Sequence, residues 1–133
     1  MAKSKNKLRV IPLGGIEEIG KNMTAIEYGN DIIVVDCGSM FPKEDLYGID
    51  LVIPDVSYLE KNADKLRGFI ITHGHEDHIG AIPYVFKQVN APIYCTKLTQ
   101  ALIENKLKEN RMQNLVKINC IQAKDIVKIG CFT

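Results

Sequence analysis

The sequence IITHGHEDHIGA, residues Ile70–Ala81, contains every histidine of the chain, with one aspartate between the second and the third. Alternate side chains of an extended segment point the same way, so His73 and His75 can converge on one metal ion. Asp77 and His78 follow where the backbone turns, and they can face a second ion. The spacing therefore predicts a two-metal site between a strand and a helix. A polar loop that happens to collect histidines is the alternative.

The composition is typical of a soluble globular domain, with 133 residues, 46% hydrophobic and 25% charged. The net charge of +1 gives no overall electrostatic case for nucleic-acid binding, although the first residues form a basic patch that could also be a solvated terminus. No apolar run approaches the roughly 20 residues of a membrane span, and no apolar signal region follows the basic start. We therefore expect a cytoplasmic protein that does not associate with membranes.

The cysteines are widely spaced, and no two of them form a CxxC motif. Three of the four lie within or beside apolar, strand-like runs. This pattern favours buried free thiols in a reducing compartment over a disulfide framework. The residues concerned are Cys37, Cys95, Cys120 and Cys131.

Hydrophobic patterns and turn residues predict a mixture of strands and helices. Strands are expected at residues 8–13, 23–28, 32–36, 68–72, 92–95, 116–121 and 126–132, and helices at 56–66, 79–89 and from Thr96 to about Asn110. Gly29 and Asn30 predict a hairpin turn. The order indicates an α/β fold with one mixed sheet and helices on at least one face. Because the last apolar run stops without a turn or cap, we expect a piece of a longer protein.

Two further features are expected near the histidines. Asp36 follows an apolar strand and is costly to bury unpaired, so it should reach solvent or accept hydrogen bonds, with the histidine loop as one partner. The glycine-rich loop at residues 14–22 is expected either to line the same cleft or to be purely structural. If it lines the cleft, Lys21 and Asn22 are candidates for contact with a substrate phosphate.

Several motifs together resemble a known family. THGHEDHIGAIPY, residues 72–84, is similar to the HxHxDH signature of the metallo-β-lactamase superfamily, and the strand before Asp36 is similar to its first motif. GGIEEIGKNM (14–23), VVDCGSMFP (34–42) and GIDLVIPD (48–55) are narrower. They resemble the start of the ribonuclease J family, in the β-CASP branch. The likeness covers Leu13 to Val89 and continues more loosely to the end.

The resemblance implies a metallo-β-lactamase-like αββα sandwich. Residues 1–133 would hold only its N-terminal half, one mixed sheet with flanking helices, and the family's β-CASP and C-terminal domains would lie outside this chain. The resemblance makes His73 and His75 ligands of one ion. It makes Asp77 and His78 ligands of the other, with catalytic roles, and gives Asp36 the task of hydrogen-bonding the histidine loop.

A second, weaker implication concerns a structural calcium ion. In the family, the loop that corresponds to Gly48 and Asp50 helps to bind Ca²⁺, a cation that prefers carboxylate and backbone oxygen ligands. A turn glycine flanked by solvated acids is the alternative.

The implied function is that of a metal-dependent ribonuclease with 5′-to-3′ exonuclease and endonuclease activity in RNA maturation and decay. A hydroxide held by two divalent ions would hydrolyse the phosphodiester. The ligand types suit Zn²⁺ best and leave Mn²⁺ and Mg²⁺ open. The expected partner is RNA with a 5′-monophosphate end, and the full-length protein is expected to form homo-oligomers or RNA-degradation assemblies.

The family pattern also requires a bridging aspartate and further histidines, yet no histidine follows His78. The chain would therefore carry half a site, and we expect it to be inactive alone. Two alternatives remain open. One is a metallo-β-lactamase-type hydrolase of a small thioester or lactam, and the other is a non-catalytic RNA-binding or scaffold module.

Overall fold

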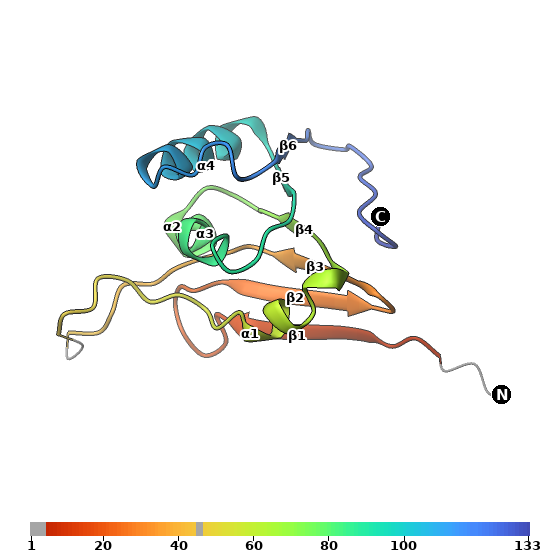
Figure 1. Ribbon diagram of the computed structural model, residues 1–133, viewed down its shortest axis with the longest axis horizontal. Helices are drawn as coiled ribbons and strands as arrows, with labels where there is room; N and C mark the ends of the chain where they lie inside the picture. The colour runs from red at the N-terminus through yellow and green to blue at the C-terminus, as the bar shows by residue number, and fades with distance from the viewer. Residues whose placement is uncertain (1–4, 45–46) are drawn as a thin grey trace.

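The computed structural model describes residues 5–44 and 47–133, so Lys3 of the basic start and Asp45 lie outside it. Within these residues the chain forms one six-stranded sheet whose strands follow each other in sequence order (Figure 1). The strands are β1 (Leu8–Gly14), β2 (Met23–Tyr28), β3 (Asp31–Val35), β4 (Leu66–Ile70), β5 (Ile93–Cys95) and β6 (Ile118–Cys120). β1, β2 and β3 are antiparallel, and β3 to β6 are parallel. The predicted mixed sheet is confirmed.

Helices provide the crossovers that parallel strands require. They are α1 (Ser57–Lys61), the 3-10 helix η1 (Ala63–Lys65), α2 (Glu76–Ile79), α3 (Ile82–Val85) and α4 (Lys97–Glu109). Right-handed crossovers between strands in sequential order place their helices on one face of the sheet. Consistent with this, buried residues of α1, α2, α3 and α4 join a single core. None of the helices in the described ranges is long and apolar enough to cross a membrane.

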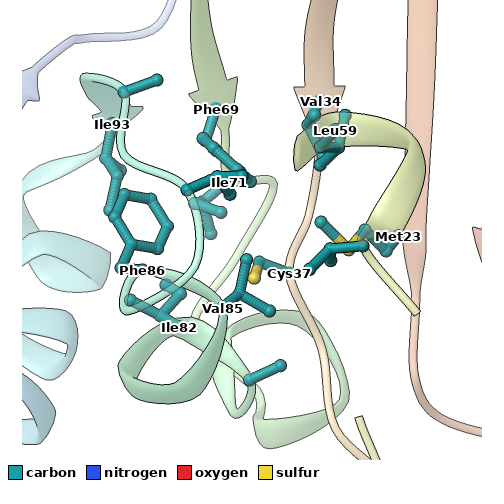
Figure 2. Close-up of a cluster of buried hydrophobic side chains, with 14 of the residues drawn as sticks. Met23, Val34, Cys37, Leu59, Phe69, Ile71, Ile82, Val85, Phe86 and Ile93 are labelled. Atoms are coloured by element: carbon teal, nitrogen blue, oxygen red, sulfur yellow. The ribbon is translucent and has the colours of Figure 1, made fainter. Parts of the chain in front are cut away.

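The core lies between this face of the sheet and the helices (Figure 2). Val34, Phe69 and Ile93 are register partners on β3, β4 and β5, so their side chains share one face. All three are fully buried. The ring of Phe86, just after α3, lies 4.7 Å from that of Phe69 between centroids. This packing holds β4, and with it the start of the histidine loop, against the helical layer.

The structure departs from the predicted elements in three places. The helix expected at 56–66 is divided into α1 and η1, and the helix expected at 79–89 is reduced to α3, while α2 begins earlier, at Glu76, and ends at Ile79. The strand expected at 126–132 is wrong, because this segment forms only an isolated bridge between Ile129 and Phe132. Val127, Ile129 and Phe132 of this segment instead line a groove of about 190 Å³ with residues of β3, β4 and β5 on the face away from the core, while Ile126 is exposed.

The cysteine prediction is confirmed in part. All four thiols are free, and Cys37 and Cys95 are buried. Cys120 and Cys131 are exposed, so their expected burial is wrong. Cys120 lies on the edge strand β6, and Cys131 lies in the segment that does not form a strand. An apolar run in the sequence does not show whether the segment forms a central strand, an edge strand or no strand, so it does not determine whether a cysteine within it is buried.

Candidate metal centre

The centre forms where three segments distant in sequence meet: residues 21–22 after the glycine-rich loop, 36–39 after β3, and 76–81 around α2. Backbone hydrogen bonds join them in a continuous network. Between the first two segments, the Gly38 N–H donates to the Asn22 carbonyl (2.9 Å), and the Asn22 N–H in turn donates to the Asp77 carbonyl of the third segment (3.0 Å). Between the second and third segments, the Cys37 N–H donates to the His78 carbonyl (2.8 Å), and the Ala81 N–H donates to the Cys37 carbonyl (3.0 Å). A Cβ on Gly38 would lie 1.6 Å from the Asp77 carbonyl oxygen. The junction therefore requires glycine at position 38.

His73, Asp77 and His78 bring one ligand atom each to within 4.8 Å of one another. The rings of His73 and His78 lie 4.0 Å apart between centroids. Two imidazole nitrogens and a carboxylate oxygen are a donor set that suits a divalent transition metal, so these residues fit the ion that the sequence motif implies. The described residues hold no second group of three His, Cys, Asp or Glu side chains with this geometry.

His75 lies beside this group and is not one of its members. Its ring centroid is 4.7 Å from that of His73, with the two rings nearly perpendicular. His75 has extended dihedrals and occupies the N-cap position of α2 without a side-chain capping hydrogen bond, whereas Asp77 and His78 lie within the helix. Alternation along the strand paired His73 with His75 on one ion, and that pairing stays a prediction. The group of three ligand atoms that the structure shows consists of His73, Asp77 and His78.

Asp36 links the end of β3 to the histidine loop. It lies just beyond the strand with φ of 63°, and only 6% of its surface is exposed. Its Oδ2 is 2.7 Å from His78 Nδ1, and its Oδ1 accepts a hydrogen bond from the Thr72 N–H at 2.8 Å. A proton shared between Nδ1 and this carboxylate leaves the lone pair on Nε2 of His78 for a metal. Thr72 Oγ1 also contacts both Asp36 and His73 Nδ1.

Of the two candidate phosphate contacts, only Asn22 lies at the centre. Its Nδ2 donates to the Asp77 carbonyl at 3.1 Å and to Asp77 Oδ2 at 3.2 Å, and it is 3.4 Å from His78 Nε2. Lys21 Nζ instead pairs with Glu18 Oε1 at 3.2 Å. The pKa of the Glu18 carboxyl is lowered, first by the Gly15 N–H and then by Lys21. The side chain of Lys21 is thus held within its own loop.

The glycine-rich loop shares a pocket with Glu76 and Asp77 of the histidine segment, although none of the three histidines lines it. The pocket has a volume of about 400 Å³ and is bounded by residues Ile19, Gly20, Ser39, Met40, Phe41, Glu76 and Asp77. Cys37, between Asp36 and Gly38, is fully buried. Burial and the neighbouring Asp36 raise the pKa of the Cys37 thiol well above its usual range, so this thiol is a poor metal ligand at neutral pH.

The structure does not test the calcium prediction, which stays a prediction. Gly48 and Asp50 are exposed, and a Cβ on Gly48 would meet nothing within 4 Å. The positive φ of 77° at Gly48 is a sufficient reason for glycine at this turn.

Sequence reasoning missed the contribution of α4, which forms a wall beside the histidine loop. Lys106 Nζ pairs with Glu76 Oε1 at 2.7 Å. A Cβ on Gly74 would lie 2.4 Å from Leu102 Cδ1, so the loop passes directly over the helix. No local signal in the sequence pairs these residues, which lie about 30 positions apart.

Comparison with known proteins places this geometry in a family. Residues 17–128 match the family profile described as the metallo-beta-lactamase superfamily. Ribonuclease J 2 of Staphylococcus aureus (strain NCTC 8325 / PS 47) is 45% identical over 129 residues, which cover 96% of this chain and 23% of that protein. Ribonuclease J 2 of Staphylococcus saprophyticus is 43% identical with the same coverage. The chain thus spans 23% of the length of these curated relatives.

Solved structures with low sequence identity share the fold. A protein of unknown function from Enterococcus faecalis V583 aligns with a TM-score of 0.69 and 18% identity, covering 93% of this chain and 36% of that one. A diphosphatase from the PhnP family aligns with a TM-score of 0.59 and 15% identity, covering 92% and 54%. The sheet, the histidine motif and these matches lead to one assignment: the chain belongs to the metallo-β-lactamase superfamily, and its sequence is ribonuclease J-like.

Proposed function

We propose that this chain is part of the catalytic domain of a metal-dependent ribonuclease that hydrolyses RNA phosphodiesters. The observation that carries the proposal is the group of His73, Asp77 and His78, held by Asp36 from one side and by Asn22 from the other. The 45% identity to a ribonuclease J 2 supports RNA as the substrate. We also propose a cytoplasmic location. For the full-length protein, the proposal includes 5′-to-3′ exonuclease and endonuclease activity and the formation of homo-oligomers or RNA-degradation assemblies.

His73, Asp77 and His78 would hold the first ion, and His75 beside them would contribute to a second, with Zn²⁺ as the best match and Mn²⁺ or Mg²⁺ also compatible. Divalent ions at this centre would supply Lewis-acid stabilisation of the phosphodiester and activation of water. The chain's own contribution is orientation. Asp36 fixes the ring of His78 through Nδ1, while Thr72 does the same for His73.

Asn22 is the side chain best placed to contact a substrate phosphate. Its Nδ2 group reaches Asp77 and approaches His78, so it lies within hydrogen-bonding distance of the metal-ligand group. A neutral amide donor can bind a phosphate oxygen without repelling the cations that the centre attracts. We propose that it positions the scissile phosphate of RNA, preferably near a 5′-monophosphate end.

The 133 residues alone are expected to be inactive. Three grouped ligand atoms leave at least one position of a four-coordinate ion to water, and no histidine after His78 can complete a second ion. Binding of metal should therefore be weak and catalysis absent. Completion of the centre requires ligands from outside this sequence.

A chimera tests both parts of the proposal. This chain would replace the matching 129 residues of the S. aureus ribonuclease J 2, and the chimera and the chain alone would be assayed on 5′-monophosphorylated RNA with added metal. We expect hydrolysis by the chimera only, with loss of activity on chelation and in His78→Ala. Equal activity of the chain alone would contradict the half-site argument.

The same chimera distinguishes the other function classes. If it is folded and metal-loaded but cleaves a thioester or lactam and leaves RNA intact, the small-substrate hydrolase replaces the ribonuclease. In the chimera, where the centre is complete, elemental analysis of the parent and of a His73→Ala, His75→Ala variant addresses the scaffold alternative. A metal site loses its ion in the variant, whereas a scaffold shows no metal content to lose.

A further inference from the structure

Strand β6 lies at the edge of the sheet beside β5 (Figure 1), and the two strands place two cysteines directly opposite each other. Cys95 and Cys120 are register partners, and the Ile121 N–H donates to the Cys95 carbonyl at 2.8 Å, which fixes this register. Neighbouring strands lie about 4.8 Å apart, and a disulfide bridges Cα atoms that are about 4.4 to 6.8 Å apart. Opposite side chains project to the same face. The backbone therefore already has the spacing that a disulfide needs.

The two thiols differ sharply in their surroundings. Cys95 is fully buried, and its burial, with smaller contributions from Cys120 and Glu104, raises its pKa to about 11. Cys120 is exposed on the outermost strand. A small oxidant in solution can thus reach Cys120 while Cys95 is shielded. This is the arrangement of an accessible thiol beside a protected partner that can resolve its oxidised form.

We propose that Cys95 and Cys120 are a redox-active pair whose disulfide fixes the edge strand β6 to β5. A hydroperoxide oxidises the Cys120 thiol to a sulfenic acid and is itself reduced, releasing water or an alcohol. The Cys95 sulfur then attacks the Cys120 sulfur, the S–O bond breaks, and the oxygen leaves as water. The two thiols together lose two electrons and two protons, and the hydroperoxide gains them.

The disulfide would act on the wall of the metal centre. The loop that it closes, residues 95–120, contains all of α4. α4 touches the histidine loop through the Lys106–Glu76 ion pair and through Leu102 beneath Gly74. Thr96, next to Cys95, lines a pocket together with His73 and His75. Oxidation would therefore restrict the movement of β6 and α4 relative to the histidine loop, whichever substrate the complete centre acts on.

Peptide mapping of the 133-residue chain tests the proposal directly. The dilute native chain would be treated with hydrogen peroxide, remaining thiols alkylated, and the protein digested with trypsin without reduction. We expect peptides 88–97 and 118–124 to be joined by a disulfide, which a reductant separates. The rate of the second step should rise as pH rises towards the pKa of Cys95, because the attacking species is the thiolate.

Thermal unfolding and matched variants provide the controls. Closing the loop of residues 95–120 should raise the thermal unfolding midpoint by about 10 °C in the parent and in Cys131→Ser, but not in Cys120→Ser. A reductant should reverse the increase. The proposal is overturned if oxidation of the folded chain yields only intermolecular disulfides through Cys120 or Cys131. It is equally overturned if Cys120 is oxidised to the sulfinic acid while Cys95 remains available for alkylation after unfolding.

Discussion

His78 Nδ1 lies 2.7 Å from Asp36 Oδ2, although the two residues are 42 positions apart in the sequence. Asp36 is almost completely buried, and the Thr72 N–H and hydroxyl occupy its other oxygen. One carboxylate thus orients the ring of a candidate metal-ligand histidine and holds the start of the loop that carries it. The contact connects the end of β3 to the segment that follows β4, so the sheet itself sets the geometry of the centre.

The first prediction concerns this contact. Asp36→Asn keeps the size of the side chain and removes its charge, and we expect the affinity for Zn²⁺ to fall by about 10- to 100-fold. Asparagine tolerates the positive φ at this position, so the fold should be retained. Competition with a chelating dye measures the affinity, and circular dichroism checks the fold. The exposed Asp50→Asn is the control, and an equal loss there would show a general effect of charge.

The second prediction separates the histidines by their positions. Because His78 belongs to the group of three ligand atoms and His75 does not, His78→Gln should weaken binding of the first ion more than His75→Gln. Isothermal titration of the chain with Zn²⁺, at a pH where imidazoles are neutral, measures both. The reverse order would favour the pairing of His73 with His75 that alternation along the strand predicts.

The parts of the fold that local sequence patterns determine were predictable. Gly29 and Asn30 indicated the hairpin between β2 and β3, and Gly29 does take a positive φ of 60°. Alternation of apolar runs with helical patterns indicated the mixed sheet. The same patterns could not show that residues 126–132 leave the sheet, because apolar residues suit a strand and a segment packed on its outer face equally well.

Some residues of the candidate site could likewise be predicted from the sequence, and others could not. The histidine motif and Asp36 could be identified because burying such polar or charged side chains without a partner costs free energy. The contacts of Asn22 with Asp77 and of Lys106 with Glu76 were not visible, since each joins segments that only the folded sheet brings together. Lys21 and Asn22 are adjacent and both polar, so the sequence could not separate them. In the structure Lys21 has a positive φ of 52°, and its side chain pairs with Glu18 while that of Asn22 reaches Asp77.

The third prediction concerns stability at acid pH. The pKa of the Asp31 carboxyl lies below its ordinary value of 3.8, chiefly because the Arg67 Nε–H donates to it at 2.6 Å. A depressed pKa contributes stability above the unfolded value, and the contribution disappears as pH falls through the folded value. The parent should therefore be slightly more stable than Asp31→Asn at neutral pH, and the difference should vanish well below pH 3.8.

Urea unfolding between neutral and strongly acidic pH measures this difference, which should be small because the pair is exposed. Asp31 also accepts a hydrogen bond from the Cys131 N–H at 2.8 Å, so Asp31→Asn should speed hydrogen exchange at that amide. Asp64→Asn is the control for the same chemical change at an exposed position. If the difference between the parent and Asp31→Asn persists below pH 3, the contribution does not come from the charge of Asp31.

The fourth prediction concerns the junction beneath the metal centre. In Gly38→Ala the new methyl group would overlap the Asp77 carbonyl oxygen and crowd the Asn22 nitrogen, both of them backbone atoms that cannot rotate away. We expect a loss of more than ~3 kcal/mol of unfolding free energy, beyond the usual cost of overpacking. Metal binding should fall with it, because the displaced segment carries Asp77 and His78. Gly48→Ala is the matched control, since its methyl group enters open space and only the positive φ costs about 1 kcal/mol. Similar midpoints of thermal unfolding for the two variants would contradict the close packing of the three segments at position 38.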